Sequence, residues 1–401
     1  MSEITGKTVY VLGAGASHHT GAPLLRDFLV RARLLLDGKE NLQYRESFER
    51  TFGWINSLRG SSYYVEFDLD NLEHVFSLAE MERQIGLKDS DQKVSDLRRL
   101  ILETLDRCQL KVEGGQIIPD KIYSMFVENL DLLNQERKDS FGDPSEFERD
   151  VIITFNYDVM LDYAMRFRGL NPEYCLPGLS KPREDHFRVL KLHGSANWAS
   201  CSGAGCAGHL QVLPANPVPP TQGVRVPPKN GTSLNFAMVT KVMSQYACDK
   251  CKQNRTLSPI IIPPTWSKMV EGSPISKVWE TAVAELNTAF QIVVIGYSMP
   301  LTDTFFQYLL TLGLSANSSL HRVVVIDPND SDEFRQRYEG VFSRSLIERG
   351  RLEFLTGITF CDYLRSNISH QGRPDNSGMS SVGTSLSLGG LKGRIMQLAG
   401  K

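Results

Sequence analysis

The chain has 401 residues, of which 41% are hydrophobic and 22% are charged, which is an ordinary globular composition and excludes a largely disordered protein. Its 44 basic and 46 acidic residues give a formal net charge of -2, so no global field draws it onto nucleic acid or anionic lipid. Because the sequence shows neither a secretory signal nor an apolar run of about 18 residues, we expect a cytoplasmic protein without a membrane span. The 7 cysteines, an odd number, then favour metal ligation or buried thiols over a disulfide framework.

The fold class follows from short apolar runs without polar alternation, which are typical of strands buried on both faces of a parallel sheet. Such runs occupy 9–13, 151–155, 188–192, 292–296, 322–326 and 352–355. Helical patterns occupy 23–36, 71–84, 93–108, 121–134, 158–167, 276–289, 303–313 and 332–343. We therefore expect an α/β protein with a Rossmann-like, doubly wound parallel sheet.

Three segments differ from the main domain, which we place at residues 1–365. Residues 35–149 have mostly helical patterns over more chain than one crossover needs, and they predict a helical insertion. Residues 199–258 combine four cysteines with several Gly and Pro residues, and they predict a small irregular module. Residues 366–401 are rich in Ser and Gly, and they predict a weakly ordered tail.

A glycine turn, Gly13 to Ser17, follows the first predicted strand directly. Glycines let a backbone approach a phosphate closely, and the N–H groups at the start of the next helix attract anions. His18 occupies the place of the third glycine of a full dinucleotide fingerprint, so an ordinary strand-to-helix turn stays open as an alternative. The first ligand that this turn predicts is an adenine dinucleotide.

Two further strands end in polar residues at the edge where open α/β sheets bind ligands. Asn156 follows the strand at 151–155, and its amide can offer a donor and an acceptor to a ribose or a water. Asp158 is most simply the N-cap of the next helix. His193 follows the strand at 188–192 with Gly194 beside it, which favours a catalytic role over that of a structural histidine.

The last two strand ends of interest carry Gly296, Tyr297 and Ser298, and Asp327. The first group offers hydroxyl and backbone contacts to a phosphate or ribose, and the carboxylate of Asp327 can accept bonds from ribose hydroxyls. Each end is equally compatible with a turn that binds no ligand. Two such ends on one sheet favour a shared crevice.

The cysteines of the irregular module form two pairs, Cys201-x4-Cys206 and Cys248-x2-Cys251. Two such pairs predict a four-thiolate zinc site, although they lie further apart than the roughly 15–20 residues usual in zinc ribbons. The alternative is a set of scattered buried thiols. Because four sulfur ligands leave no position for an activated water, such a zinc would be structural.

Taken in order, these segments resemble the sirtuin family. Gly13 to Arg26 matches the family's GAGxS…GIPxFR block with GAP at the GIP positions, TFNYD stands at TQNID, LHG at HG and GYS at GTS. The resemblance spans about residues 8 to 330, interrupted by the insertion and the module. Phe155 replaces the family's glutamine, and NYD, KLHGSANW and GYSMPLTD are more similar to a bacterial sirtuin-like branch associated with anti-phage defence, whose members hydrolyse NAD.

The resemblance implies an NAD hydrolase that releases nicotinamide and ADP-ribose, with Asn156 and His193 as its catalytic pair and Asp158 as a further catalytic candidate. An NAD-dependent protein-lysine deacylase and a non-catalytic sensor of NAD or ADP-ribose remain alternatives. The metal ligands it implies are Cys201, Cys206, Cys248 and Cys251. The candidate NAD-binding residues are Gly13, Ala14, Gly15, Ala16, Ser17, Pro23, Arg26, Phe155, Gly296, Tyr297, Ser298 and Asp327.

Expected partners follow from the same resemblance. Some proteins of this branch are encoded with a hexameric HerA-type ATPase, so we expect such a partner and a homo-oligomer by analogy. Direct nucleic-acid binding through the cysteine module is not expected. Its lysines and arginine give local positive charge, but it has few aromatic residues for base stacking.

Overall fold

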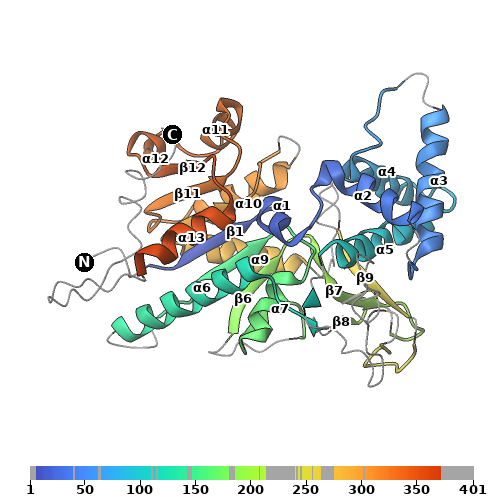
Figure 1. Ribbon diagram of the computed structural model, residues 1–401, viewed down its shortest axis with the longest axis horizontal. Helices are drawn as coiled ribbons and strands as arrows, with labels where there is room; N and C mark the ends of the chain where they lie inside the picture. The colour runs from blue at the N-terminus through green and yellow to red at the C-terminus, as the bar shows by residue number, and fades with distance from the viewer. Residues whose placement is uncertain are drawn as a thin grey trace.

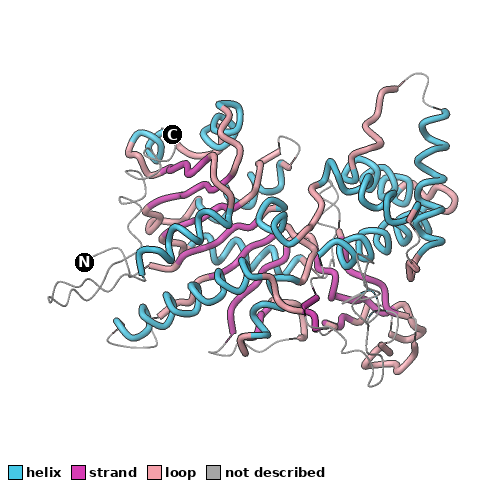
Figure 2. Tube along the Cα trace, viewed as in Figure 1, coloured by secondary structure: helices cyan, strands magenta, loops and turns pink. Residues whose placement is uncertain are grey.

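The structure is a computed structural model of the chain, organised around one large sheet (Figure 1). The sheet has 7 strands in the order β12-β11-β10-β1-β4-β6-β5, with helices on both of its faces (Figures 1 and 2). The residues that the structure describes are 6–38, 41–61, 65–109, 112–113, 116–141, 147–179, 186–206, 208–213, 240, 243, 246–254, 256–262, 275–300 and 303–371.

Every neighbouring pair of strands in this sheet is parallel. The central strand β1 buries Val9, Val11 and Leu12 completely, because helices cover both of its faces. The predicted doubly wound parallel sheet is therefore confirmed, and the short edge strand β5 is an addition to it. The strands are β1 (Thr8–Leu12), β4 (Val151–Thr154), β5 (Asn171–Glu173), β6 (His186–Lys191), β10 (Gln291–Ile295), β11 (Arg322–Asp327) and β12 (Leu352–Thr356).

The covering helices form two layers. On one face α6 contacts both α7 and α13, and on the other α9 and α10 pack together (Figure 1). The helix predicted at 332–343 ends earlier, at Glu339. Ser343 then caps a separate helix by accepting a hydrogen bond from the N–H of Leu346 at 3.4 Å. These helices are α6 (Lys121–Ser140), α7 (Met160–Phe167), α9 (Ser276–Asn287), α10 (Thr304–Leu314), α11 (Asp332–Glu339), α12 (Arg344–Glu348) and α13 (Phe360–Gln371).

A second hydrophobic core joins four helices to the cysteine module. Leu97 and Ile101 of α5 belong to the same buried cluster as Cys248 and Ile261, and Arg98 Nε donates to the carbonyl oxygen of Ile261 at 3.1 Å. The strands of the module form an antiparallel sheet in the order β8-β7-β9. The elements are α2 (Leu25–Asp37), α3 (Arg45–Ser61), α4 (Leu72–Gln84), α5 (Ser90–Gln109), β7 (Gly194–Cys201), β8 (Leu210–Val212) and β9 (Leu257–Ile261).

Helix α6 lies inside the range predicted as a helical insertion, yet it packs on the main sheet. Its residues Tyr123, Phe126 and Val127 belong to the buried cluster that contains β1 and β4. A short antiparallel pair, β2 (Val112–Glu113) and β3 (Gln116–Ile117), precedes it. Of the helices that precede β4, those that share a core with the cysteine module are thus α2 to α5.

The weakly ordered tail was predicted to begin at residue 366, but the structure continues as a helix beyond that residue. Helix α13 continues to Gln371, because its first turns pack Phe360 and Leu364 into the main core. Phe360 stacks edge-on against Phe126 of α6, with ring centroids 5.4 Å apart. Residues 372–401 lie outside the described part of the chain.

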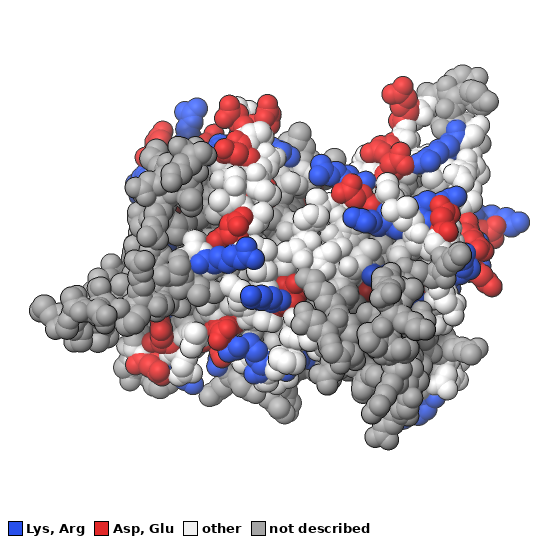
Figure 3. Space-filling view, viewed as in Figure 1, with Lys and Arg blue, Asp and Glu red and all other residues white. Residues whose placement is uncertain are grey.

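Charges of both signs are interspersed over the face drawn in Figure 3. Among the residues described there, neither the blue nor the red side chains gather into one dominant patch. This distribution agrees with the small net charge of -2 and with the expectation of no strong single-sign field. In the described parts of the chain, no helix is both long and apolar enough to cross a bilayer.

Candidate functional site

The loops that carry the sequence motifs meet at one edge of the main sheet, since its strands all run in the same direction. The N–H of Phe155 donates to Leu12 O at 3.1 Å, and the N–H of Leu192 donates to Thr154 O at 3.0 Å. These bonds continue the parallel ladder past the strand ends into the loops. The glycine turn, the candidate amide and the candidate imidazole therefore share the carboxyl edge of three adjacent strands.

The glycine turn leads into the short helix α1 (Ala14–Ser17) and packs against the loop after β10. A Cβ added to Gly13 would lie 2.4 Å from Gly296 O, and one added to Gly15 would lie 2.9 Å from Gly296 Cα. The N–H groups of Gly13, Gly15 and Ala16 donate to carbonyls of Ile295, Gly296 and Gly13 at 2.8–3.0 Å. The close approach that requires glycine here is to another loop, and these three N–H groups are engaged within the fold.

We expect Gly296→Ala to destabilise the protein by about 1–3 kcal/mol from backbone strain alone. Gly296 has a φ of +61°, and an added Cβ would lie 2.3 Å from Ala16 N. Gly53→Ala is the matched control because nothing lies within 4 Å of a Cβ added there, in helix α3. Thermal unfolding should show a lower Tm for Gly296→Ala and an equal or higher Tm for Gly53→Ala. Equal Tm values for both variants would contradict the packing described for the glycine turn.

Asn156 is held against the glycine turn by its side chain. Its Nδ2 donates to Gly13 O and to Ser17 Oγ, both at 2.8 Å. Its backbone N–H donates to Thr154 Oγ1 at 3.1 Å. Because the two amide hydrogens are engaged, Oδ1 is the acceptor that this half-buried side chain can offer to a ligand. From the sequence we expected the Asn156 amide to offer both a donor and an acceptor to a ligand. In the structure its acceptor oxygen is the atom left for that contact.

Ser17 connects the catalytic candidates Asn156 and Asp158. Its Oγ donates to Asp158 Oδ2 at 2.7 Å and accepts from Asn156, so the hydroxyl of Tyr123, 2.7 Å away, must donate to it. Burial and the nearby Asp158 carboxylate raise the pKa of Tyr123 well above its usual value, which keeps that hydroxyl protonated. The N-cap of α7 is Val159, so the prediction of Asp158 in that position was wrong by one residue. The other oxygen of Asp158 still accepts from the N–H of Met160, the first residue of α7, at 3.0 Å.

Tyr123 is a site residue that the sequence did not indicate. It lies on α6, 106 residues from Ser17 in the chain, within a helix whose pattern marks it only as an apolar core position. No local motif surrounds it. The topology alone brings its hydroxyl to the glycine turn.

His193 lies among aromatic side chains at the end of β6. Its ring is edge-on to Phe155 at 5.1 Å and tilted against Tyr157 at 6.0 Å between centroids. Phe155 in turn stacks on Tyr297, with centroids 4.7 Å apart and planes inclined by 22°. The backbone of the loop is fixed, because Ile262 N donates to His193 O at 2.9 Å. The imidazole is therefore buried beside Phe155, the neighbour of Asn156 in the chain.

The remaining predicted NAD-binding residues are less closely connected. Asp327 ends β11, and burial raises the pKa of its carboxyl, while the N–H of Asn329 donates to its Oδ1 at 2.8 Å. Ser298 is exposed after β10, and Pro23 is half-buried. Arg26 is 81% exposed on α2, where its Nε lies 3.6 Å from Asp27 Oδ2, so the structure does not bring it against Asn156 or His193.

The four cysteines of the module form one cluster. Their sulfur atoms all lie within 4.8 Å of one another, with Cys206 and Cys248 3.4 Å apart and Cys201 and Cys251 3.6 Å apart. A tetrahedral zinc with Zn–S bonds of about 2.3 Å requires sulfur separations of roughly 3.8 Å. Contacts with the Thr256 hydroxyl and the Gly203 N–H lower the pKa of Cys201, whereas burial raises the pKa of Cys206, so the fit to zinc rests on the geometry of the four sulfur atoms. The residues fit a structural zinc site, as predicted from their spacing.

Comparisons with known proteins give weak similarities. No protein-family model and no curated protein matches the chain. Among solved structures, it is similar to a triple mutant of a Sir2 homologue with 2′-O-acetyl-ADP-ribose (16% identity, TM-score 0.40, 92% of this chain and 95% of that one). It is also similar to a single mutant of a Sir2 homologue with ADP-ribose (14%, 0.41, 93% and 96%) and to Sir2Tm bound to a propionylated peptide (13%, 0.37, 91% and 93%). These values are too low to assign the chain to a family.

Proposed function

We propose that the protein is an NAD hydrolase that cleaves the bond between nicotinamide and ribose. One observation carries this proposal: Asn156 is hydrogen-bonded to Gly13 O and Ser17 Oγ, while His193 packs on the adjacent Phe155. An amide acceptor and an imidazole thus lie beside a glycine turn at the carboxyl edge of a doubly wound sheet. That edge is where such sheets bind dinucleotides.

In this proposal NAD lies along the sheet edge from β11 to β6. The carboxylate of Asp327 accepts bonds from the adenosine ribose, and the exposed hydroxyl of Ser298 contacts the pyrophosphate. The glycine turn supplies a surface of fixed shape, since its loop is tied to Gly296. The nicotinamide ribose then lies near Asn156 and His193.

Cleavage needs only modest help from the protein, because nicotinamide leaves as a neutral molecule and the ribose carbon can bear oxocarbenium character. Asn156 Oδ1 holds the attacking water or a ribose hydroxyl, and His193 accepts the proton that the water loses. The C–N bond to nicotinamide breaks while a C–O bond to water forms. NAD and water thereby give nicotinamide, ADP-ribose and a proton.

Zinc bound to the four cysteine thiolates would hold the module together and would take no part in this step. Four sulfur ligands complete its coordination and leave no place for water or substrate. Two strands link the module to the site: β7 runs directly from His193 to Cys201, and Ile262, which follows β9, bonds to His193 O at 2.9 Å. The metal is thus expected to act on the site through structure.

The proposal has three further parts. The protein acts in anti-phage defence, it forms a homo-oligomer, and it has a hexameric ATPase as its partner. They rest on the resemblance of the motifs GAGAS, TFNYD, KLHGSANW and GYSMPLTD to one bacterial branch. An enzyme that depletes NAD must be restrained until needed, and assembly is one means of restraint. Light scattering of the pure chain, alone and with a candidate ATPase, tests the assembly directly.

The test of the proposed activity is product analysis. Purified protein incubated with NAD, without any acylated peptide, should release nicotinamide and ADP-ribose in equal amounts. Release that depends wholly on an acyl-lysine peptide would instead identify a deacylase. Binding of NAD that leaves it intact after prolonged incubation would identify a sensor and overturn the proposal.

A further inference from the structure

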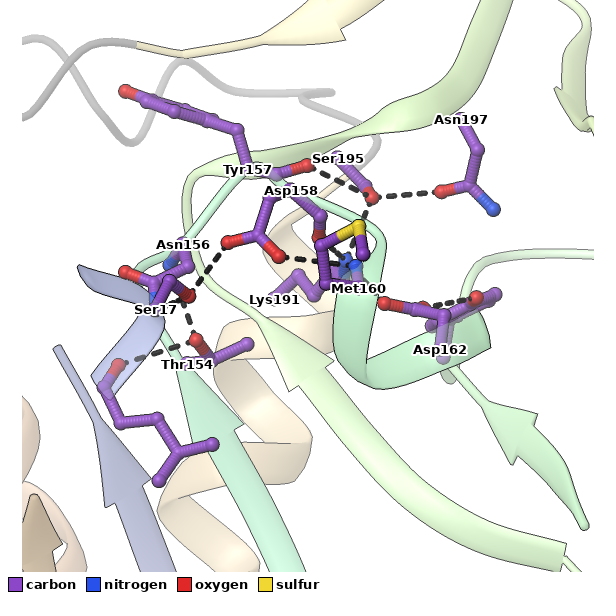
Figure 4. A network of polar contacts seen from close by, with 12 residues as sticks. Ser17, Thr154, Asn156, Tyr157, Asp158, Met160, Asp162, Lys191, Ser195 and Asn197 are labelled. Atoms are coloured by element: carbon purple, nitrogen blue, oxygen red, sulfur yellow. Dashed lines mark hydrogen bonds and ion pairs between the residues drawn. The ribbon is translucent and has the colours of Figure 1, made fainter. Parts of the chain in front are cut away.

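A buried lysine lies directly behind the candidate site. Lys191, the last residue of β6, is 1% exposed, and its Nζ lies 2.8 Å from Oδ2 of Asp162, which is completely buried on α7. Lys191 Nζ also donates to Asp158 O at 2.6 Å and to Ser195 Oγ at 2.9 Å. Figure 4 shows these groups converging on the ammonium from the loop after β4, from α7 and from β7. The ammonium thus donates hydrogen bonds to two oxygens and forms an ion pair with a carboxylate.

These contacts tie together the two loops that carry the catalytic candidates. Asp158 belongs to the loop that holds Asn156, and Ser195 lies two residues after His193. One further bond joins the two loops, because Ala196 N donates to Tyr157 O at 2.8 Å. Within β7, Ser195 Oγ donates to Asn197 Oδ1 at 2.7 Å, which orients the Ser195 hydroxyl. Among the side chains labelled in Figure 4, Lys191 is the one that carries a positive charge.

A buried charge is tolerated only when it is paired and its hydrogens are satisfied. The pairing with Asp162 balances the charge of Lys191, and the two hydrogen bonds give the ammonium a defined position. Such a cluster has few alternative arrangements, because moving either loop would take a hydrogen-bond acceptor away from the buried ammonium. Burial, geometry and charge therefore all favour a fixed spacing between the two loops.

We propose that Lys191 is a positioning residue that sets the placement of Asn156 relative to His193. It acts through the backbone of Asp158 and the side chain of Ser195, and its hydrogen bonds and ion pair go to neither Asn156 nor His193. The inference rests on the proposed function for its effect on NAD cleavage. Its effect on the two loops is independent of that function and can be measured separately.

The experiment compares two charge-neutral double variants. Lys191→Met with Asp162→Asn removes the pair behind the site. Lys7→Met with Glu285→Gln removes another buried pair, 2.7 Å between Nζ and Oε2, which lies at the start of β1 and thus at the opposite edge of the sheet. We expect the first to lower kcat about 10–100-fold with KM within about threefold, because small misplacements of catalytic groups are costly. The second should keep kcat within about twofold.

Hydrogen exchange supplies the readout that does not depend on activity. Amides at 155–160 and 192–197 should exchange at least about tenfold faster in the Lys191 and Asp162 variant than in the Lys7 and Glu285 variant. Unchanged exchange there, or a raised KM with unchanged kcat, would overturn the proposal. Wild-type protein that releases no nicotinamide would refute the proposed function, while the exchange result would still decide the role of Lys191.

A milder variant covers the case in which the double variant does not fold. Ser195→Ala removes one of the three partners of Lys191 and leaves the ion pair with Asp162 intact. We expect it to remain folded, with kcat lowered about 3–10-fold and with faster exchange at 192–197. Wild-type values for both quantities would overturn the proposal.

Discussion

Replacing His193 with alanine should lower kcat for NAD cleavage by about 10²–10⁴-fold, the usual contribution of a general base. The imidazole is the proposed proton acceptor, and the rings of Phe155 and Tyr157 that lie against it cannot accept a proton in its place. Nicotinamide release measured by chromatography gives kcat and KM for each variant. KM should change little, because the ring is proposed to act on the attacking water.

His321→Ala is the matched control for this prediction. That histidine is exposed, stacks on Phe290 with centroids 5.2 Å apart, and precedes β11 at the opposite edge of the sheet. Its removal should leave kcat within about twofold. Asn156→Ala should resemble His193→Ala, and the double variant should lose little more than either single one, because groups that act together are not additive. Full activity of His193→Ala would contradict the assignment.

The main sheet was predictable because its strands are short apolar runs that are buried on both faces. Val9 to Leu12 and Ile292 to Ile295 are almost entirely buried, and nothing but a covered parallel sheet explains such runs at this spacing. The meeting of the motif loops could then be predicted from the direction of the strands alone, since parallel strands all end at the same edge of the sheet. The cysteine cluster could likewise be predicted, because the spacing of the cysteines in the sequence indicates two pairs of metal ligands.

Other features depend on contacts between distant segments and could not be predicted from local pattern. The glycine turn was interpreted as a phosphate site, yet Gly13 and Gly15 are glycines in part because Gly296 lies against them. Tyr123 reaches Ser17 only through the packing of α6 on the sheet. Helix α3 was overlooked although Phe48, Phe52 and Ile55 have helical spacing and are buried.

Removing zinc should lower both stability and NAD cleavage, even though the metal has no catalytic position. Cys201, Cys206 and Cys248 are buried in the core shared with α5, and α5 is bonded to β9 through Arg98 and Ile261. Zinc binding contributes directly to folding free energy, so a loss of about 5 kcal/mol would lower Tm by roughly 10–20 °C for a domain of some 150–250 residues. Calorimetry with and without a chelator measures the change.

Cys206→Ser should reproduce the effect of chelation and reduce bound zinc from about one per chain to nearly none by metal analysis. Cys361→Ser is the control, because that half-buried thiol lies on α13 at the main core and outside the cluster. The fall in activity should follow the fall in folded protein, since Ile262, which follows β9, bonds to His193 O. A chelated protein with unchanged Tm but no activity would contradict this view, because it would require the metal to act on the reaction itself.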